Sequence, residues 1–189
     1  MRDLKQKLIT GAVGLFIAAL IAVFVSPAYR EGEPSIAGQT PRDFAFTLNG
    51  KAMHLSDLRG HVVVLNFWFS SCPPCVEEAA SLNALQQHIT GIGGTVLGVD
   101  ADVAPEDEAS YEKFLKDNSI IYPTYLDTSQ KIAAAFGTEM YPETYIIGPD
   151  GKFERKIIGA QDWTSPEMLS YISALAPRKQ SVQESSLLP

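Results

Sequence analysis

The sequence predicts one α/β domain with a mixed sheet covered by helices, and three observations lead to this. Residues 62–69 form a nearly all-apolar run, which is typical of a central strand buried on both faces. Residues 95–100 form a second apolar run after a helix-like segment, and such a β-α-β unit has parallel strands joined by a right-handed crossover. Asn49-Gly50 and residues 148–151 are hairpin signals, which add antiparallel strands.

Periodicity and capping residues place the other elements. In chain order we expect a hairpin over residues 44–55, a helix from Val76 to about His88, an amphipathic helix over residues 105–118, a short helix over residues 128–136, strands over residues 143–147 and 152–158, and a last helix through Leu175. Asp127 or Thr128 would begin the short helix, and Gly137 would end it. Ser165 or Thr164 would begin the last helix.

The two ends of the chain differ in composition from the folded part. Basic residues precede residues 8–25, an uncharged apolar run that would span about 27 Å as a helix, enough to cross a bilayer core. This predicts a single-pass anchor over residues 1–28 that exports the rest of the chain, and a cleaved signal peptide is the alternative. We expect residues 29–39 to be a tether, residues 40–176 one domain, and residues 177–189 a disordered tail.

The net charge of −7 argues against nucleic-acid binding and indicates a soluble surface for the folded part. Neither repeats nor blocks of like charge are evident in the sequence.

Cys72 and Cys75 are the only cysteines of the chain, and they enclose two prolines where the apolar strand gives way to a helix. Free N–H groups and the helix dipole stabilise a thiolate at such a position, so the pair is predicted to be redox-active. A structural disulfide is less favoured, because so short a loop removes little chain entropy. Metal or copper handling is the other reading, but zinc normally needs four ligands, and no metal site is predicted.

Residues around this motif are similar to those of a known family. Trp68 precedes the motif, residues 140–144 (Met-Tyr-Pro-Glu-Thr) precede a later strand, and residues 55–60 and 145–151 carry two further matching phrases. The chain thus resembles the membrane-anchored TlpA/ResA/CcmG-like thiol–disulfide oxidoreductases of bacteria over about residues 37–176. The resemblance implies a thioredoxin fold with an N-terminal β-hairpin extension and a central helical insert.

The resemblance also implies roles for the motif. Cys72 would be the exposed nucleophile and Cys75 the buried resolving thiol, and Cys72 is indeed the cysteine nearer the helix N-terminus. Glu78 would lie on nearly the same helix face as Cys75, where it could pass a proton to or from that thiol. The alternative for Glu78 is a solvated acid favoured by the helix dipole.

Client binding is implied for residues on both sides of the motif. Pro142 matches a cis-proline that faces the cysteines, and Tyr141 before it would pair with a client chain by β-addition. Glu143 resembles an acid that helps to choose partners, and its alternative is an exposed charge at a strand start. Trp68 matches an aromatic beside the motif; the alternative is plain core packing, and both can be true.

The motif itself supplies Ser71, Pro73 and Pro74 as further client-binding candidates. Ser71 departs from the tryptophan usual there, which makes the approach to Cys72 more polar. Asn66 stands where thioredoxin carries a buried aspartate, which leaves proton handling to Glu78.

The implied activity is reduction of specific client disulfides, with no cofactor beyond the Cys72–Cys75 disulfide. The implied partners are client proteins with thiols or disulfides, such as apocytochrome c or another metalloprotein, and a membrane dithiol donor. The implied location is the bacterial cytoplasmic (inner) membrane, with the domain facing the periplasm or cell exterior.

Two other functions remain open. Residues 55–60 also resemble peroxiredoxins, although residues 69–75 do not match a peroxidatic loop. A copper- or haem-handling module is the third possibility, because two thiolates can bind Cu(I).

Overall fold

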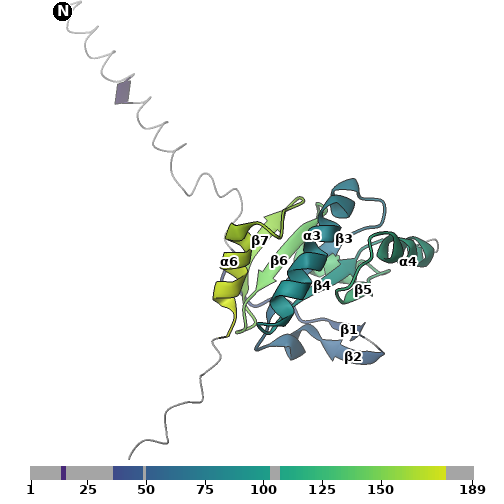
Figure 1. The fold of residues 1–189 in the computed structure, drawn as a ribbon, viewed down its shortest axis with the longest axis horizontal. Coiled ribbons are helices and arrows are strands. Elements are labelled where there is room, and N and C mark those ends of the chain that lie inside the picture. Colours follow the sequence, from purple (N-terminus) through teal and green to yellow (C-terminus); the bar gives the residue numbers. More distant parts are fainter. Residues whose placement is uncertain (1–13, 16–35, 49, 103–106, 178–189) are drawn as a thin grey trace, which may run out of the picture. The chain divides into compact units, whose positions relative to one another are not determined.

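The computed structural model describes residues 14–15, 36–48, 50–102 and 107–177 (Figure 1). The chain divides into two units, Met1–Ser35 and Ile36–Pro189, and the description below concerns the second. Nearly all of the predicted anchor, most of the tether and nearly all of the tail fall outside the described residues. Within those ranges, none of the helices is both long and apolar enough to cross a membrane.

A five-stranded mixed sheet forms the centre of the second unit, in the order β5-β4-β3-β6-β7 (Figure 1). The strands are β3 (Val62–Trp68), β4 (Gly94–Asp100), β5 (Thr124–Leu126), β6 (Glu143–Ile147) and β7 (Phe153–Ile158). β3, β4 and β5 are parallel, whereas β6 runs antiparallel to both β3 and β7. The predicted β-α-β unit and the second hairpin are therefore confirmed.

The remaining elements are helices and a small separate sheet. They are β1 (Ala45–Leu48), β2 (Lys51–His54), the 3-10 helix η1 (Leu55–Leu58), α3 (Pro73–Thr90), α4 (Asp107–Asp117), α5 (Lys131–Phe136) and α6 (Pro166–Leu175). β1 and β2 form the predicted N-terminal hairpin, and α4 is the predicted helical insert.

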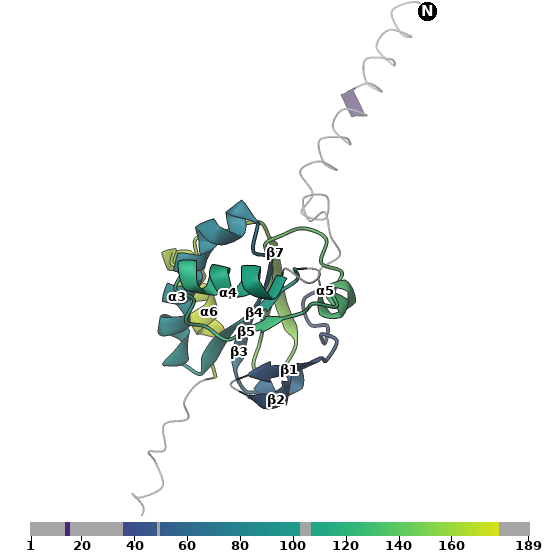
Figure 2. The same cartoon turned by 90° about the vertical axis from the view of Figure 1, so that its right-hand side faces the viewer.

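Alternate side chains of β3 enter different layers, as the two-residue period of a strand requires. Val62 and Val64 pack with α3 and α6, whereas Val63, Leu65 and Phe67 pack with α5 and the N-terminal hairpin. Figure 2 shows α3 and α6 on one side of the sheet and α5 on the other. By the same alternation, the side chains of Asn66 and Trp68 lie on the face of the sheet that α3 covers.

Two helix starts differ from the prediction. α3 begins at Pro73 rather than Val76, because a helix tolerates proline in its first turn, where N–H groups have no helical acceptor. α5 begins at Lys131, after Gln130 in a left-handed conformation. Asp127 still caps this helix, since its carboxylate accepts the N–H of Ile132 at 2.7 Å.

Other boundaries follow the prediction more closely. Ser165 caps α6 by accepting the N–H of Met168 at 3.3 Å, and Gly137 ends α5 with a φ of 68°. Residues 36–39, expected in the tether, belong to the folded unit. Gly38 and Gln39 exchange backbone hydrogen bonds with Phe153 at 2.8 and 2.9 Å.

Candidate active site

Cys72 and Cys75 form a disulfide at the start of α3. Cys72 is the N-cap of this helix, and its Sγ accepts the backbone N–H of Cys75 at 3.3 Å. The first N–H groups of a helix lack helical acceptors and carry partial positive charge. When the disulfide is reduced, the same position favours a Cys72 thiolate.

Both cysteines are buried in this oxidised form. Each is 2% exposed, so the expectation that Cys72 is the exposed thiol is wrong here. The physical reason is that both cysteines belong to an apolar cluster, against which Phe69 and Tyr141 pack with their rings edge to face at 5.2 Å.

Glu78 is also buried, at 2% exposure, so the solvated alternative is wrong. Its Oε1 accepts Asn66 Nδ2 at 2.8 Å. Its Oε2 accepts Trp163 Nε1 at 3.0 Å and the backbone N–H of Gln161 at 3.2 Å. Burial raises the pKa of Glu78, and the hydrogen bonds from Trp163, Asn66 and Gln161 offset only part of that rise. A buried acid with a raised pKa is suited to accept and release a proton during catalysis.

Asn66 connects Glu78 to the neighbouring strand. Its amide group donates to Thr144 Oγ1 at 2.9 Å as well as to Glu78. Asn66 is neutral and acts as a donor, so in this group of three side chains the proton-binding site is the Glu78 carboxyl.

The Tyr141–Pro142 peptide bond is cis, as the match to the family's proline requires. Pro142 is buried, and its carbonyl accepts the N–H of Gly159 at 2.8 Å. Tyr141 is half-buried and contacts the cluster around the disulfide. The structure thus places this dipeptide beside the cysteines.

Glu143 does not lie at the surface. It is 1% exposed, so the alternative of an exposed strand-start charge is wrong. Its carboxylate accepts Thr138 Oγ1 at 2.9 Å and the hydroxyl of Tyr145, and it pairs with Lys156 Nζ at 3.4 Å. Glu143 therefore anchors the loop that leads to the cis-proline.

Trp68 is buried in the cluster that contains both cysteines. Its ring stacks on Phe114 at 4.0 Å and on Tyr111 at 6.0 Å, which brings α4 against the motif. Its Nε1 has no hydrogen-bond partner among the described residues. Apolar residues of α4 thus join the cluster around the cysteines, and Trp68 contributes packing.

A surface groove of about 310 Å³ lies between the motif and α4. Ser71 and Val76 line it on the motif side, and Lys113, Phe114 and Asp117 line it on the α4 side. The expected client-binding residues Ser71 and Pro73 are exposed and Pro74 is half-buried, so this part of the motif faces solvent.

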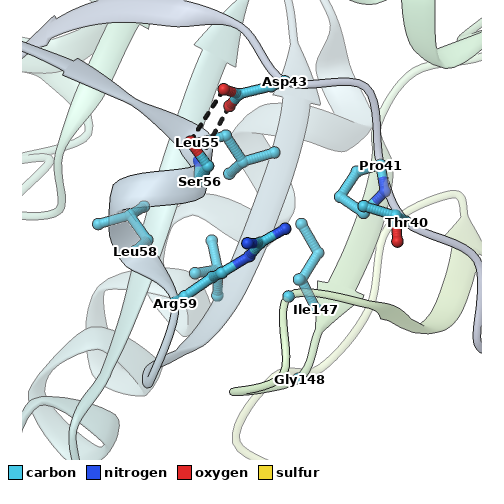
Figure 3. Close-up of a pocket in the computed structure, with 11 residues that line it drawn as sticks. Thr40, Pro41, Asp43, Leu55, Ser56, Leu58, Arg59, Ile147 and Gly148 are labelled. Atoms are coloured by element: carbon cyan, nitrogen blue, oxygen red, sulfur yellow. Dashed lines mark hydrogen bonds between the residues drawn. The ribbon is translucent and has the colours of Figure 1, made fainter.

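A smaller cavity of about 150 Å³ lies elsewhere, beside the N-terminal hairpin (Figure 3). Its wall includes Leu55, Val63 and Ile147, and Arg59 extends across it. Val63 and Ile147 pair across β3 and β6 at the end of the sheet opposite the cysteines. This cavity is therefore separate from the redox site.

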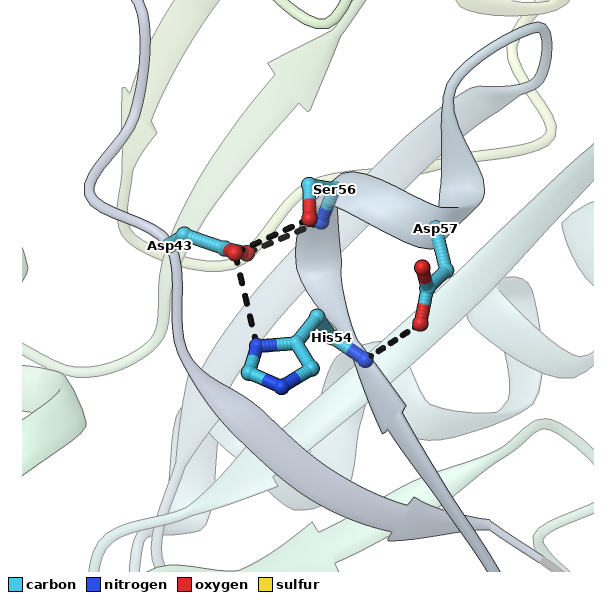
Figure 4. A network of polar contacts seen from close by, with 4 residues as sticks. All are labelled: Asp43, His54, Ser56 and Asp57. Atoms are coloured by element: carbon cyan, nitrogen blue, oxygen red, sulfur yellow. Dashed lines mark hydrogen bonds and ion pairs between the residues drawn. The ribbon is translucent and has the colours of Figure 1, made fainter.

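A polar network fixes the rim of that cavity (Figure 4). The Asp43 carboxylate accepts the N–H and the hydroxyl of Ser56, both at 2.9 Å, and faces His54 Nδ1 at 3.4 Å. Partial burial raises the pKa of Asp43, but the Ser56 hydrogen bonds and His54 outweigh it and leave the pKa lowered. Asp57 accepts the backbone N–H of His54 at 2.8 Å, which ties β2 to η1.

No group of three or more His, Cys, Asp or Glu side chains that could hold a metal ion occurs within the described parts of the chain. The cysteine pair and Glu78 therefore remain the chemically distinctive groups of the site.

A helix-start cystine beside a cis-proline, on a mixed sheet of this order, defines the thioredoxin-fold thiol–disulfide oxidoreductases. Residues 37–156 match the model of the AhpC/TSA family. The chain belongs to this family, within its ResA/CcmG-like thioredoxin-fold members, and is a thiol–disulfide oxidoreductase.

Named relatives agree with this assignment. The chain is 31% identical to the thiol-disulfide oxidoreductase ResA of Bacillus thuringiensis (strain Al Hakam) over 142 residues, which cover 75% of this chain and 79% of that protein. It is 27% identical to ResA of Bacillus subtilis (strain 168) over 173 residues, covering 91% and 94%. A Chlorobium tepidum protein provisionally named thiol:disulfide interchange protein DsbE is similar in structure, with a TM-score of 0.65 and 25% identity over 72% of this chain and 96% of that chain.

Sequence reasoning missed several residues that shape the site. Trp163 and Gln161 hold Glu78 from a distant segment, and Lys156 neutralises Glu143 from the edge strand. No local spacing connects these residues to the cysteines. The one available signal was that Trp163 is one of only two tryptophans in the chain.

Proposed function

We propose that this oxidoreductase is tethered to the bacterial cytoplasmic membrane and reduces the disulfides of specific client proteins on the outer side. The observation that carries the proposal is an N-cap cysteine followed on the same helix by a buried acid. Cys72 Sγ accepts the N–H of Cys75, and the Glu78 carboxyl lies one turn further along α3. The apolar residues 8–25 support the tether.

The exchange reaction uses the two cysteines and Glu78 in turn. The Cys72 thiolate attacks one sulfur of the client disulfide, and the other client sulfur leaves as a thiolate that takes a proton from water. Cys75 gives its proton to Glu78 and attacks Cys72 Sγ, which releases the second client thiolate and forms the Cys72–Cys75 disulfide. Two electrons pass to the client, and a membrane dithiol donor returns them to the cysteine pair.

The clients we propose are apocytochrome c thiols, or those of another metalloprotein that awaits its cofactor. The groove beside Ser71 and α4 gives such a client a surface next to Cys72. A disulfide-bonded peptide with Cys-x-x-Cys-His, the haem-attachment spacing of c-type cytochromes, is a suitable probe.

Trapping with Cys75→Ala tests the exchange mechanism. The variant keeps the nucleophile and lacks the resolving thiol, so it should accumulate a mixed disulfide through Cys72, and mass spectrometry of the adduct identifies the client. Cys72→Ala in the same background is the matched control and should trap nothing. If Cys75→Ala forms no adduct in cells, the mechanism fails.

The reduction potential tests the direction of electron transfer between this protein and its clients. Equilibration with glutathione or dithiothreitol buffers gives that potential, and a value well above about −200 mV would contradict a reductant role.

Carbonate washing of a membrane fraction tests the tether. An anchored chain stays in the pellet, so release of the protein into the wash would exclude the anchor.

A further inference from the structure

Glu78 is held by a segment that the exchange reaction above does not use. Trp163 Nε1 and the backbone N–H of Gln161 both donate to Glu78 Oε2, at 3.0 and 3.2 Å. Trp163 is fully buried and lies in the connection between β7 and α6. Because packing fixes the indole, it fixes the direction from which Glu78 receives this hydrogen bond.

Ser81 ties the same segment to α3. Its Oγ donates to the carbonyl of Glu78 at 2.8 Å and accepts the backbone N–H of Trp163 at 3.4 Å. The segment that binds the Glu78 carboxylate is thus attached to the helix that carries Glu78, one turn beyond it.

A surface pocket of about 290 Å³ opens beside this contact. Its lining is Glu77, Glu78, Ser81, Ala160, Gln161 and Asp162. The lining includes Glu78 and, among the described residues, neither cysteine nor the cis-proline dipeptide. Solvent in this pocket therefore approaches Glu78 from a side other than the client-binding side.

We propose that Trp163 and Gln161 hold Glu78 as a proton port, through which the proton of Cys75 leaves to water in this pocket while a client covers the disulfide. The inference rests on the role proposed for Glu78. The S–H bond of Cys75 breaks, an O–H bond forms on the Glu78 carboxylate, and that proton then passes to a pocket water. Trp163 is a positioning residue in this scheme, since it acts through Glu78.

Other titratable groups face Glu78 or its pocket. Glu77 and Asp162 line the pocket, and hydrogen bonds from Thr164 lower the pKa of Asp162, which keeps it anionic. Burial first and Glu78 second raise the pKa of Tyr122, which keeps that phenol neutral. Because Asp162 stays anionic and Tyr122 stays neutral, the titration of Glu78 is the one that follows the reaction.

Trp163→Phe tests the positioning role, because it keeps an aromatic ring and removes the N–H donor. Loss of a hydrogen bond to the carboxylate should move the midpoint of Glu78 upward by about one pH unit. The ¹³C carboxyl resonance of Glu78 reports this midpoint. The pH profile of single-turnover oxidation by a Cys-x-x-Cys-His disulfide peptide, followed by acid quench and mass spectrometry, should shift equally. Unchanged midpoints in both would overturn the proposal.

Controls separate this inference from the proposed function. Thr164→Val alters the next residue and removes only the exposed hydroxyl hydrogen bond to Asp162, so it should leave both midpoints in place. In a Glu78→Gln background, Trp163→Phe should cause no further change in the pH profile. If Glu78→Gln alone leaves the profile unchanged, the proton role of Glu78 fails. If Glu78→Gln changes the profile but Trp163→Phe does not, the proposed role of Trp163 and the pocket fails and the proton role of Glu78 stands.

Two measurements keep the test decisive if Trp163→Phe does not fold. In the unaltered protein, the indole ¹H–¹⁵N resonance of Trp163 should titrate with the Glu78 midpoint, and an indole signal that stays constant would contradict the contact. Ala160→Phe fills the pocket from its rim and should slow single-turnover oxidation at every pH. An unchanged rate in that variant would exclude this route.

Discussion

Asn66 Nδ2 donates a 2.8 Å hydrogen bond to Glu78 Oε1, which joins the central strand to the helix that begins at the disulfide. A neutral donor on the strand leaves the acid on the helix as the group that binds the proton. Glu78 is buried, and this burial raises its pKa above the ordinary value for a glutamate.

The titration of Glu78 should be visible in the stability of the oxidised protein. Between the ordinary value of 4.5 and the raised folded value, the folded state binds more protons than the unfolded state, so the free energy of unfolding falls as pH rises. Each unit of difference corresponds to about 1.4 kcal/mol. In urea unfolding, the Glu78→Gln variant should not show this fall. Its free energy of unfolding should therefore rise relative to that of the unaltered protein as the pH increases toward neutral.

Glu77→Gln is the matched control for that measurement. Glu77 is the exposed neighbour on the same helix, and its replacement should leave the fall with pH in place. Parallel stability curves for the unaltered protein and Glu78→Gln would contradict the prediction.

The ion pair between Lys156 and Glu143 should contribute far more than an exposed pair. Lys156→Met leaves the Glu143 carboxylate buried without its cation, which should cost about 3 kcal/mol of unfolding free energy. Lys113→Met breaks a solvent-exposed pair with Asp117 and should cost less than about 1 kcal/mol. Denaturant unfolding measures the loss of unfolding free energy in each variant. Equal losses would contradict the prediction that the buried pair contributes more.

A second substitution tests the cause of the Lys156 effect. Adding Glu143→Gln to Lys156→Met removes the unpaired buried charge, so the double variant should be more stable than Lys156→Met alone. A double variant that is less stable would show that Lys156 acts through packing.

Gly98 should not tolerate a side chain. A Cβ there would lie 3.0 Å from Trp68 Nε1 and 3.1 Å from Tyr122, so Gly98→Ala should destabilise the protein by about 1–3 kcal/mol. Gly91 ends α3 in a helical conformation with its nearest contact at 3.9 Å. Gly91→Ala should be neutral or slightly stabilising. Thermal unfolding of both variants checks the contrast.

Val76 should contribute to client binding. It is 45% exposed, directly follows Cys75 and lines the groove beside α4. Val76→Ser should slow reaction with the Cys-x-x-Cys-His disulfide peptide by roughly 5- to 10-fold, since an apolar interface contact is lost. A neutral substitution is chosen because an acid would disturb the Cys72 thiolate.

Ile121 supplies the control for Val76. It is 54% exposed, precedes β5 and is not among the residues that line the groove. Ile121→Ser should leave the peptide reaction unchanged, and neither variant should alter reaction with dithiothreitol. A loss of the dithiothreitol reaction in Val76→Ser would indicate damage to the disulfide itself.

Much of the fold could be predicted because its signals are local. The apolar run before the cysteines identified the central strand, and the spacing to the next run identified its parallel neighbour. The start of α3 was placed too late, since Pro73 and Pro74 were not recognised as first-turn residues. The role of Asp127 was only half predicted, because its carboxylate caps α5 from four residues before its first residue.

The site could be predicted only where the motif is contiguous. The sequence by itself determined the cysteine pair at a helix start and an acid three residues beyond it, because both depend on neighbours in the chain. Only the tertiary structure decided that Glu78 is buried and hydrogen-bonded by Trp163. Trp163 lies 85 residues further along the chain, and packing of the β7–α6 connection brings its indole to the Glu78 carboxylate. The tertiary structure also decided that Cys72 is buried in the oxidised form, within a cluster against which Tyr141 packs from another strand connection.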